Sequence, residues 1–117
     1  MKKVIYLAGP YTASSPEEIN ANVTAAINVQ GELMRHGYAV FSPHANYGHG
    51  PAGVTYQSVM DMCFAHLSTA NLIVMMPGWE RSSGSCREIG FAIARNIPVY
   101  YWPTDAEQLL SQADGDS

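Results

Sequence analysis

The sequence predicts an α/β fold, a flavodoxin- or Rossmann-like three-layer sandwich with a mainly parallel sheet of four to five strands. Short apolar runs rich in β-branched and aromatic residues alternate along the chain with longer stretches whose apolar residues recur at helical spacing. Strands that alternate with helices form right-handed βαβ units, which place helices on both faces of a parallel sheet. The 117 residues, 47% of them hydrophobic, suffice for one domain with a buried core.

The first half of the chain has clear element boundaries. Residues 4–8 are a β-rich run and predict the first strand. Ser15 is the expected N-cap of a long helix, because Pro16 suits the first helical position and Glu18 completes a capping box. Gly37 is a natural stop for this helix.

The rest of the chain continues the alternation after a long loop over 43–54, and loops of this length are usually functional. We expect a strand over 38–42, a helix over 55–68, a strand over 72–76, a helix from about 84 to 95, a strand over 98–101 and a short helix that Thr104 and Glu107 cap. The apolar pattern places four residues of the helix over 84–95 on its inner face: Cys86, Ile89, Gly90 and Ile93. Residues 1–112 are predicted to form a single domain, and 113–117 a flexible tail.

Charge and composition exclude several function classes. The net charge of -4 and the scattered Lys and Arg residues argue against a nucleic-acid polymer or an anionic membrane surface as partner. A small phosphorylated ligand remains compatible with this charge. No stretch has the length of a membrane span and no signal peptide is visible, so a cytoplasmic protein is expected. Cys63 and Cys86 are expected to be buried, reduced thiols.

The predicted topology locates a site. Ligands bind such sheets beyond the carboxyl ends of the strands, so residues 9–12, 42–53 and 77–88 are expected to meet in one crevice. A helix N-terminus that follows a strand and a polar turn also binds phosphates well. Four residues there are the candidate ligand contacts, with helix capping as the alternative role: Ser82, Ser83, Gly84 and Ser85.

Two carboxylates are candidates for catalysis. Glu88 is expected in the first helical turn, where the helix dipole and free N–H groups favour its ionised form. An ionised carboxylate beside a bound sugar can attack the anomeric carbon or stabilise an oxocarbenium-like transition state. The alternative is an ordinary glutamate at a helix start. Asp61 lies within the predicted helix before the third strand. It could face the crevice as a proton donor or sugar anchor, and the alternative is a position on a solvated helix face.

Other residues of the expected crevice are weaker candidates. Pro10 and Tyr11 could line the ligand, although a plain strand-to-helix connection would look similar. Trp79 could stack on a nucleobase or serve in packing. His44 and His49 lack a third ligand at suitable spacing, so no metal site is expected. Neither a GxxxxGK[ST] nor a GxGxxG motif is present.

These motifs resemble the nucleoside 2-deoxyribosyltransferase superfamily, most closely its small, single-domain phage and bacterial branch, which is related to 2'-deoxynucleoside 5'-phosphate N-hydrolases. The resemblance covers residues 3–102. Three stretches carry it: Leu-Ala-Gly-Pro-Tyr at 7–11, Ser-Pro-His at 42–44, and Pro-Gly-Trp-Glu-Arg-Ser-Ser-Gly at 77–84 followed by Arg-Glu-Ile-Gly-Phe-Ala at 87–92.

The resemblance implies roles for individual residues. It implies that Glu88 is the nucleophile and that Ser82 and Gly84 bind the sugar or a 5'-phosphate. It also implies that Gly9 lines the sugar site, and it places His44 among the substrate contacts.

The proton-handling partner departs from the family pattern. The resemblance implies an aspartate in the helix before the third strand, and Asp61 is the nearest match. Asp61 lies ten residues before Asn71, about two residues farther upstream than the pattern expects, and Asn71 stands where the family often has aspartate.

The sequence therefore predicts an enzyme that cleaves or transfers the N-glycosidic bond of a (deoxy)nucleoside or nucleoside 5'-monophosphate. Glu88 would act at C1', and Asp61, helped by Tyr11, would assist the leaving base or hold sugar hydroxyls. No cofactor or metal is needed for this chemistry, and a homodimer or higher homo-oligomer is expected. The alternative is a non-catalytic nucleotide-binding or sensing module of the same fold.

Overall fold

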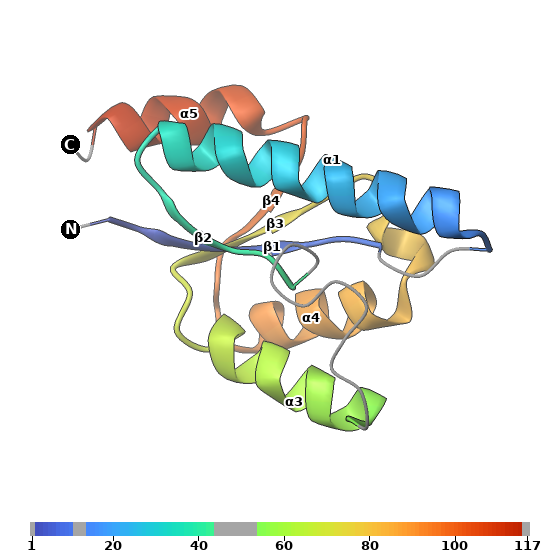
Figure 1. The fold of residues 1–117 in the computed structure, drawn as a ribbon. Coiled ribbons are helices and arrows are strands. Elements are labelled where there is room, and N and C mark those ends of the chain that lie inside the picture. The colour runs from blue at the N-terminus through green and yellow to red at the C-terminus, as the bar shows by residue number, and fades with distance from the viewer. Residues whose placement is uncertain (1, 11–13, 44–53, 116–117) are drawn as a thin grey trace.

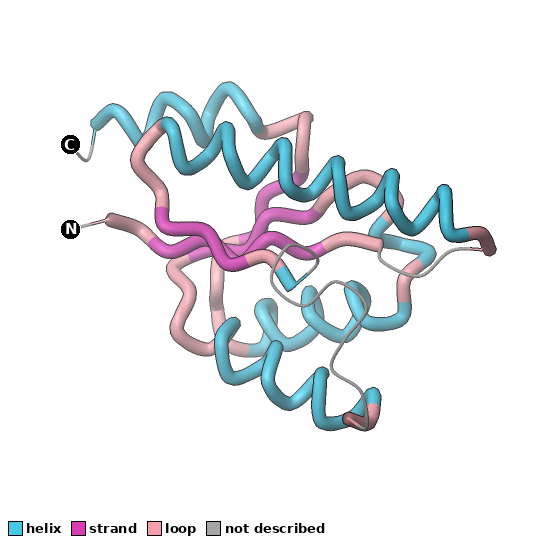
Figure 2. Tube along the Cα trace, in the orientation of Figure 1, coloured by secondary structure: helices cyan, strands magenta, loops and turns pink. Residues whose placement is uncertain are grey.

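The computed structural model confirms the predicted fold, and it describes residues 2–10, 14–43 and 54–115. Four parallel strands form one sheet in the order β2-β1-β3-β4. Helices α1 and α5 cover one face of this sheet and α3 and α4 cover the other (Figure 1; Figure 2). The elements are β1 (Val4–Ala8), α1 (Pro16–Arg35), β2 (Ala39–Phe41), α3 (Tyr56–Leu67), β3 (Leu72–Met75), a 3-10 turn (Trp79–Arg81), α4 (Ser83–Ala94), β4 (Val99–Tyr101) and α5 (Ala106–Gly115).

Local signals explain where the first and last helices begin. Ser15 caps α1 as predicted, because its Oγ accepts a hydrogen bond from the Glu18 N–H at 3.2 Å. The Glu18 carboxylate instead accepts from the Ser14 hydroxyl. Helix α5 begins at Ala106, later than the predicted cap at Thr104, and the Asp105 carboxylate accepts the N–H of Tyr101 at 2.8 Å.

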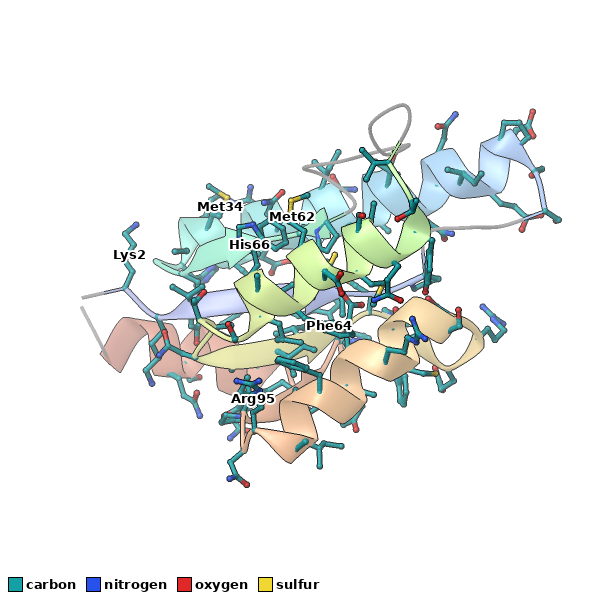
Figure 3. All side chains as sticks on the ribbon, turned by 90° about the horizontal axis from the view of Figure 1, so that it is seen from below. Lys2, Met34, Met62, Phe64, His66 and Arg95 are labelled. Atoms are coloured by element: carbon teal, nitrogen blue, oxygen red, sulfur yellow. The ribbon has the colours of Figure 1, made fainter. Side chains whose placement is uncertain are left out.

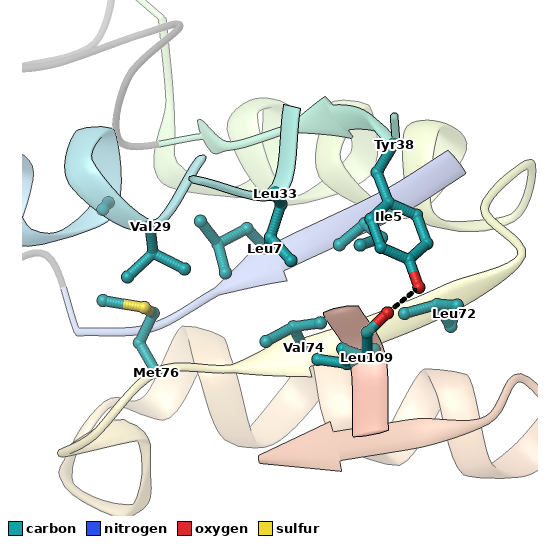
Figure 4. Close-up of a cluster of buried hydrophobic side chains, with 10 residues drawn as sticks. Ile5, Leu7, Val29, Leu33, Tyr38, Leu72, Val74, Met76 and Leu109 are labelled. Carbon is teal, nitrogen blue, oxygen red and sulfur yellow. Dashed lines mark hydrogen bonds between the residues drawn. The ribbon is translucent and has the colours of Figure 1, made fainter. Parts of the chain in front are cut away.

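The chain buries two apolar layers, one on each face of the sheet. The layer beneath α1 and α5 includes Tyr38, whose hydroxyl donates to the Leu109 carbonyl (Figure 4). The layer beneath α3 and α4 contains Tyr6, Cys63 and Ile89. Phe64 of α3 lies toward α4 in Figure 3 and stacks on Phe91 at 4.9 Å between ring centroids. This second layer positions the candidate site.

Helix α5 continues through Gly115, so residues 113–115 are helical, and the division of the chain at residue 112 stays a prediction. In the described part of the chain, no helix combines the length and the apolar character that crossing a membrane requires.

Candidate active site

Helix α4 begins within one residue of the predicted start, but Glu88 lies farther along it than the prediction has it. Ser82 is the N-cap and accepts the N–H of Ser85 at 3.2 Å, so the helix begins at Ser83. Glu88 therefore lies in the second turn, and the first turn holds no acidic residue. The prediction of a first-turn glutamate is wrong, and the free N–H groups of the helix start do not hold this carboxylate.

The inner face of α4 also differs from the prediction. Of the four residues expected there, Ile89 is buried, whereas Cys86, Gly90 and Ile93 are exposed. The buried residues recur at helical spacing and include two polar side chains: Ser85, Glu88, Ile89 and Ala92. A pattern of apolar residues could not identify this face, because half of its members are polar.

Glu88 is a buried carboxyl group held by a tyrosine. Its side chain is 6% exposed, and the Tyr6 hydroxyl donates a hydrogen bond to Glu88 Oε2. Burial raises the pKa of Glu88 to about 7, and the hydrogen bond from Tyr6 opposes that rise. The expectation of a carboxylate kept ionised by the helix dipole is therefore corrected. Burial has the larger effect on the pKa, so the Glu88 carboxyl group gains or loses its proton near neutral pH.

Tyr6 is a site residue that the sequence analysis missed. It lies in β1, pairs with Phe41 of β2 and Ile73 of β3, and is fully buried. Burial, followed by the nearby Glu88, raises the pKa of Tyr6, so its hydroxyl keeps its proton and remains a donor. The available signal was a tyrosine in a central strand, since a buried phenol needs a hydrogen-bond partner.

Asp61 does not lie at the Tyr6–Glu88 pair in the way that the resemblance implies. Asp61 is exposed on α3, where its carboxylate accepts from Gln57 Nε2 at 2.8 Å. Cys63, two residues on, is 3% exposed and lies in the same apolar layer as Tyr6. A role for Asp61 in proton handling therefore stays a prediction.

Gly9 and Pro10 follow β1 and pack against the residues that follow β3. A Cβ added at Gly9 would lie 2.6 Å from Met76 Cβ, closer than side chains approach. Pro10 Cγ lies 3.3 Å from the position of a Cβ on Gly78, whose φ of +88° favours glycine. Close packing between these strand ends is enough to require glycine at position 9.

Gly9→Ala is expected to lower the free energy of unfolding by about 1–3 kcal/mol, because the new methyl group forces Met76 and the strand end apart. Gly90→Ala is the matched control. Gly90 lies in α4, and nothing meets an added Cβ within 4 Å, so this change is expected to stabilise by up to about 1 kcal/mol. Urea unfolding of both variants measures the difference. Equal stability of the two variants would contradict the close contact.

The turn over 77–81 carries Trp79, a predicted base-stacking residue. The Trp79 ring is half-buried, packs against the apolar layer beneath α3 and α4, and lies 6.0 Å from the Tyr101 ring. Its packing role is therefore established, and stacking on a base stays a prediction.

Cys86 is an exposed free thiol that contacts the carbonyls of Trp79 and Glu80, so the expectation that both cysteines are buried is wrong for Cys86.

The first turn of α4 contains the predicted ligand contacts. Ser83 is exposed, and a Cβ on Gly84 would lie 3.5 Å from the Tyr56 hydroxyl of α3. Ser85 is 1% exposed, and its Oγ has no hydrogen-bond partner among the described residues. A buried hydroxyl without a partner is rare in folded proteins, and a bound ligand or water satisfies such a group.

Two predicted contacts, Tyr11 and His44, lie outside the described residues, as does His49. Within 2–10, 14–43 and 54–115, no group of three or more His, Cys, Asp or Glu side chains is arranged to hold a metal ion.

Residues 3–101 match the family described as "Domain of unknown function (DUF4406)". The chain belongs to this family. The DUF4406 chain is also similar to a 2-deoxyribosyltransferase from Bacillus psychrosaccharolyticus, with a TM-score of 0.62 and 24% identity over 84% of this chain and 70% of that chain. A 2-desoxiribosyltransferase from Leishmania mexicana matches with a TM-score of 0.61 and 18% identity over 85% of this chain and 63% of that chain. No curated protein matches the chain. The likenesses show that the DUF4406 chain shares the fold of these two enzymes.

Proposed function

We propose that this protein cleaves or transfers the N-glycosidic bond of a (deoxy)nucleoside or nucleoside 5'-monophosphate, with Glu88 as the nucleophile. The buried Glu88 carboxyl group, whose pKa is raised to about 7 and which accepts from Tyr6, is the observation that carries this proposal. The fold shared with two 2-deoxyribosyltransferases supports the same chemistry.

In the proposed first step, ionised Glu88 attacks C1' through one carboxylate oxygen, the C1'–N bond breaks, and its electron pair leaves with the base, which takes up a proton from solvent. Tyr6 donates to Oε2, which leaves Oε1 for the attack. In the second step, water or another base attacks C1' and gives up a proton to solvent, and Glu88 departs as a carboxylate. The Tyr6 hydroxyl assists this departure, because it stabilises the charge that returns to the carboxylate.

The start of α4 supports a 5'-monophosphate as the substrate. The first N–H groups of a helix have no partner within the helix and attract anions. Ser82 to Ser85 lie one turn before Glu88, so a phosphate held there would bring the sugar toward the carboxylate.

A homodimer also stays a prediction. The exposed apolar side chains of Tyr56 and Met62 on α3 are compatible with it.

Incubation with a panel of ribo- and deoxyribonucleosides and their 5'-monophosphates, with free base measured by chromatography, tests the proposal. Base release that depends on Glu88 supports it, and turnover only with an added free base identifies a transferase.

Because Asp61 is exposed and held by Gln57, a non-catalytic nucleotide-binding module is the second candidate. Thermal stabilisation by a nucleotide without base release from any substrate would favour that module and contradict the enzyme.

Tyr6→Phe is expected to shift the acid limb of the pH profile of kcat/KM to higher pH. In the wild type this limb should be half-maximal near pH 7, where Glu88 ionises. Loss of the hydroxyl removes the bond that lowers the pKa of Glu88, so the limb should rise by about one pH unit. Tyr38→Phe is the matched control, since it removes a buried hydroxyl from the opposite apolar layer. Identical limbs in the two variants would contradict the role of Tyr6.

Ser85→Ala is expected to change stability and substrate binding in opposite directions. Removal of an unpartnered buried hydroxyl should leave the free energy of unfolding unchanged or raise it by up to about 1 kcal/mol. The KM for a nucleoside 5'-monophosphate should rise several-fold, because the ligand loses a hydrogen-bond partner. Ser83→Ala, at an exposed position of the same turn, is the control for stability. A destabilised Ser85 variant with unchanged KM would show a purely structural hydroxyl.

A further inference from the structure

Exposed apolar side chains border one edge of the sheet. Strand β2 is an edge strand, and no described strand pairs with its outer side. Helices α1 and α3 flank it on the two faces of the sheet (Figure 1). In the described part of the chain, seven large apolar side chains are exposed, and five of them belong to α1 or to α3 and the residues just before it: Ile27, Met34, Val54, Tyr56 and Met62.

Two contacts show which flanks of these helices face β2. Gln30 of α1 donates from Nε2 to the Val40 carbonyl at 3.2 Å. The His66 ring of α3 stacks on Phe41 at 4.0 Å between centroids. Residues three or four positions apart lie on the same flank of a helix. The exposed apolar residues at these spacings therefore lie on the β2 side of their helices, as Figure 3 shows for the two methionines: Ile27, Met34 and Met62.

Helix α1 has two features that packing within the chain does not explain. Residues 19–31 contain no charged side chain, although several of them are exposed to solvent. Gly31 lies within the helix, where glycine lowers helix stability. A Cβ added there would meet only an Arg35 guanidinium nitrogen, at 3.2 Å, which is the far end of a flexible, exposed side chain. Close approach by the backbone of another helix would give this glycine a purpose.

The stripe formed by Ile27, Gly31 and Met34 is complementary to itself. If two α1 helices cross antiparallel near Gly31, Ile27 of each copy lies against Met34 of the other. Glycine at the crossing point lets the helix axes approach closely. A twofold contact covers the stripe on both chains at once, so a second copy of the chain suffices to shield it from water.

We propose that the β2 edge surface, made by the β2-facing flanks of α1 and α3 and by β2 itself, is the interface of a homodimer in which the two α1 helices cross antiparallel near Gly31. A stable interface takes about 800 Å² from each partner, about an eighth of the 6565 Å² that this chain exposes. The surface adjoins the candidate active site, because the Phe41 ring lies 5.5 Å from the Tyr6 ring.

The test is the mass of the protein in solution, measured by sedimentation velocity over a range of concentrations. The wild type should sediment as a dimer, at twice the 12.7 kDa of one chain. Ile27→Lys and Met34→Glu should each raise the dissociation constant of the dimer at least about a hundredfold, because a twofold interface buries each unpaired charge twice. Ile93→Lys is the matched control. Ile93 is exposed on α4, away from β2, and its variant should dimerise like the wild type.

Two further variants test the crossing itself. When Ile27→Lys and Met34→Glu are combined in one chain, each new ammonium group faces a carboxylate of the other copy, so at least about tenfold of the lost affinity should return. Gly31→Leu keeps α1 helical, because leucine is a good helix former, but it fills the crossing point and should yield a monomer. Circular dichroism of each variant confirms that the chain is folded.

A wild type that sediments as a monomer at every concentration would overturn the proposal. Dimers that persist in Ile27→Lys, Met34→Glu and Gly31→Leu would do the same, as would an Ile93→Lys variant that dissociates as readily as these. A double variant no tighter than the single ones would overturn the antiparallel crossing. Sedimentation needs no substrate, so this outcome is independent of whether the protein releases a base.

Discussion

Glu88→Gln is expected to lower kcat for base release by at least about a thousandfold. Glutamine has nearly the shape of glutamate and still accepts from Tyr6, but its amide cannot form the ester with C1'. The decrease should therefore appear in kcat, with a much smaller change in KM. Base release under single-turnover conditions, followed by chromatography, measures it.

Glu80→Gln is the matched control for this experiment. Glu80 is exposed in the turn just before α4, and its substitution removes the same charge from the same end of the helix. We expect the Glu80 variant to retain wild-type kcat. Comparable losses in the two variants would mean that general charge near α4, and not the Glu88 carboxylate, supports turnover.

The same substitution is expected to change how stability depends on pH. In the folded protein the pKa of Glu88 is raised from 4.5 to about 7, so between these pH values the folded state holds a proton that the unfolded state has released. The contribution of Glu88 to the free energy of unfolding is therefore fully present below pH 4.5 and is lost as the pH rises through 7. For one carboxyl group this loss amounts to about 3 kcal/mol. Glu88→Gln removes it, because the amide does not ionise.

Urea unfolding at pH 5, 6, 7 and 8 measures this effect in the wild type, Glu88→Gln and Glu80→Gln. The Glu88 variant should be the most stable of the three at pH 8, and its advantage should shrink toward pH 5. The protein would then be less stable at neutral pH because it keeps a buried carboxylate, as proteins often lose stability at functional sites. Parallel curves for all three proteins would show that Glu88 is not perturbed by burial.

The fold was predictable because its signals are local. The cap at Ser15, the apolar runs of the strands and the helical spacing of α1 each depend on a few neighbouring residues. The order β2-β1-β3-β4 then places the ends of β1 and β3 side by side, as the predicted site requires. The same alternation also indicated Glu88, since it directed attention to the helix that follows the third strand.

The arrangement around Glu88 was not predictable, because its parts come from distant segments. Tyr6 and Glu88 are 82 positions apart, and no spacing rule relates them. The inner face of α4 was misassigned because Ser85 and Glu88 occupy buried positions that apolar periodicity assigns to hydrophobic residues. Conflict between local pattern and burial is typical of functional sites. The protonation of Glu88 followed burial, which a sequence does not display.

Cys63 illustrates the same limit on a single helix. From the sequence, Asp61 was the candidate of α3, because it is the nearest match to the aspartate that the resemblance implies. The register of α3 turns Asp61 to solvent and Cys63 to the sheet. Two positions along a helix differ by about 200° of rotation, so a small error in register exchanges an exposed residue for a buried one.

The most direct test of Glu88 as nucleophile is to trap the covalent intermediate. A 2'-deoxy-2'-fluoro nucleoside 5'-monophosphate is the probe, because fluorine at C2' slows steps with an oxocarbenium-like transition state and lets the ester accumulate. Intact-protein mass spectrometry followed by peptide mapping should find one sugar phosphate per chain, attached to Glu88, with release of one equivalent of base. An adduct on another residue, or base release at the wild-type rate from Glu88→Gln, would contradict the assignment.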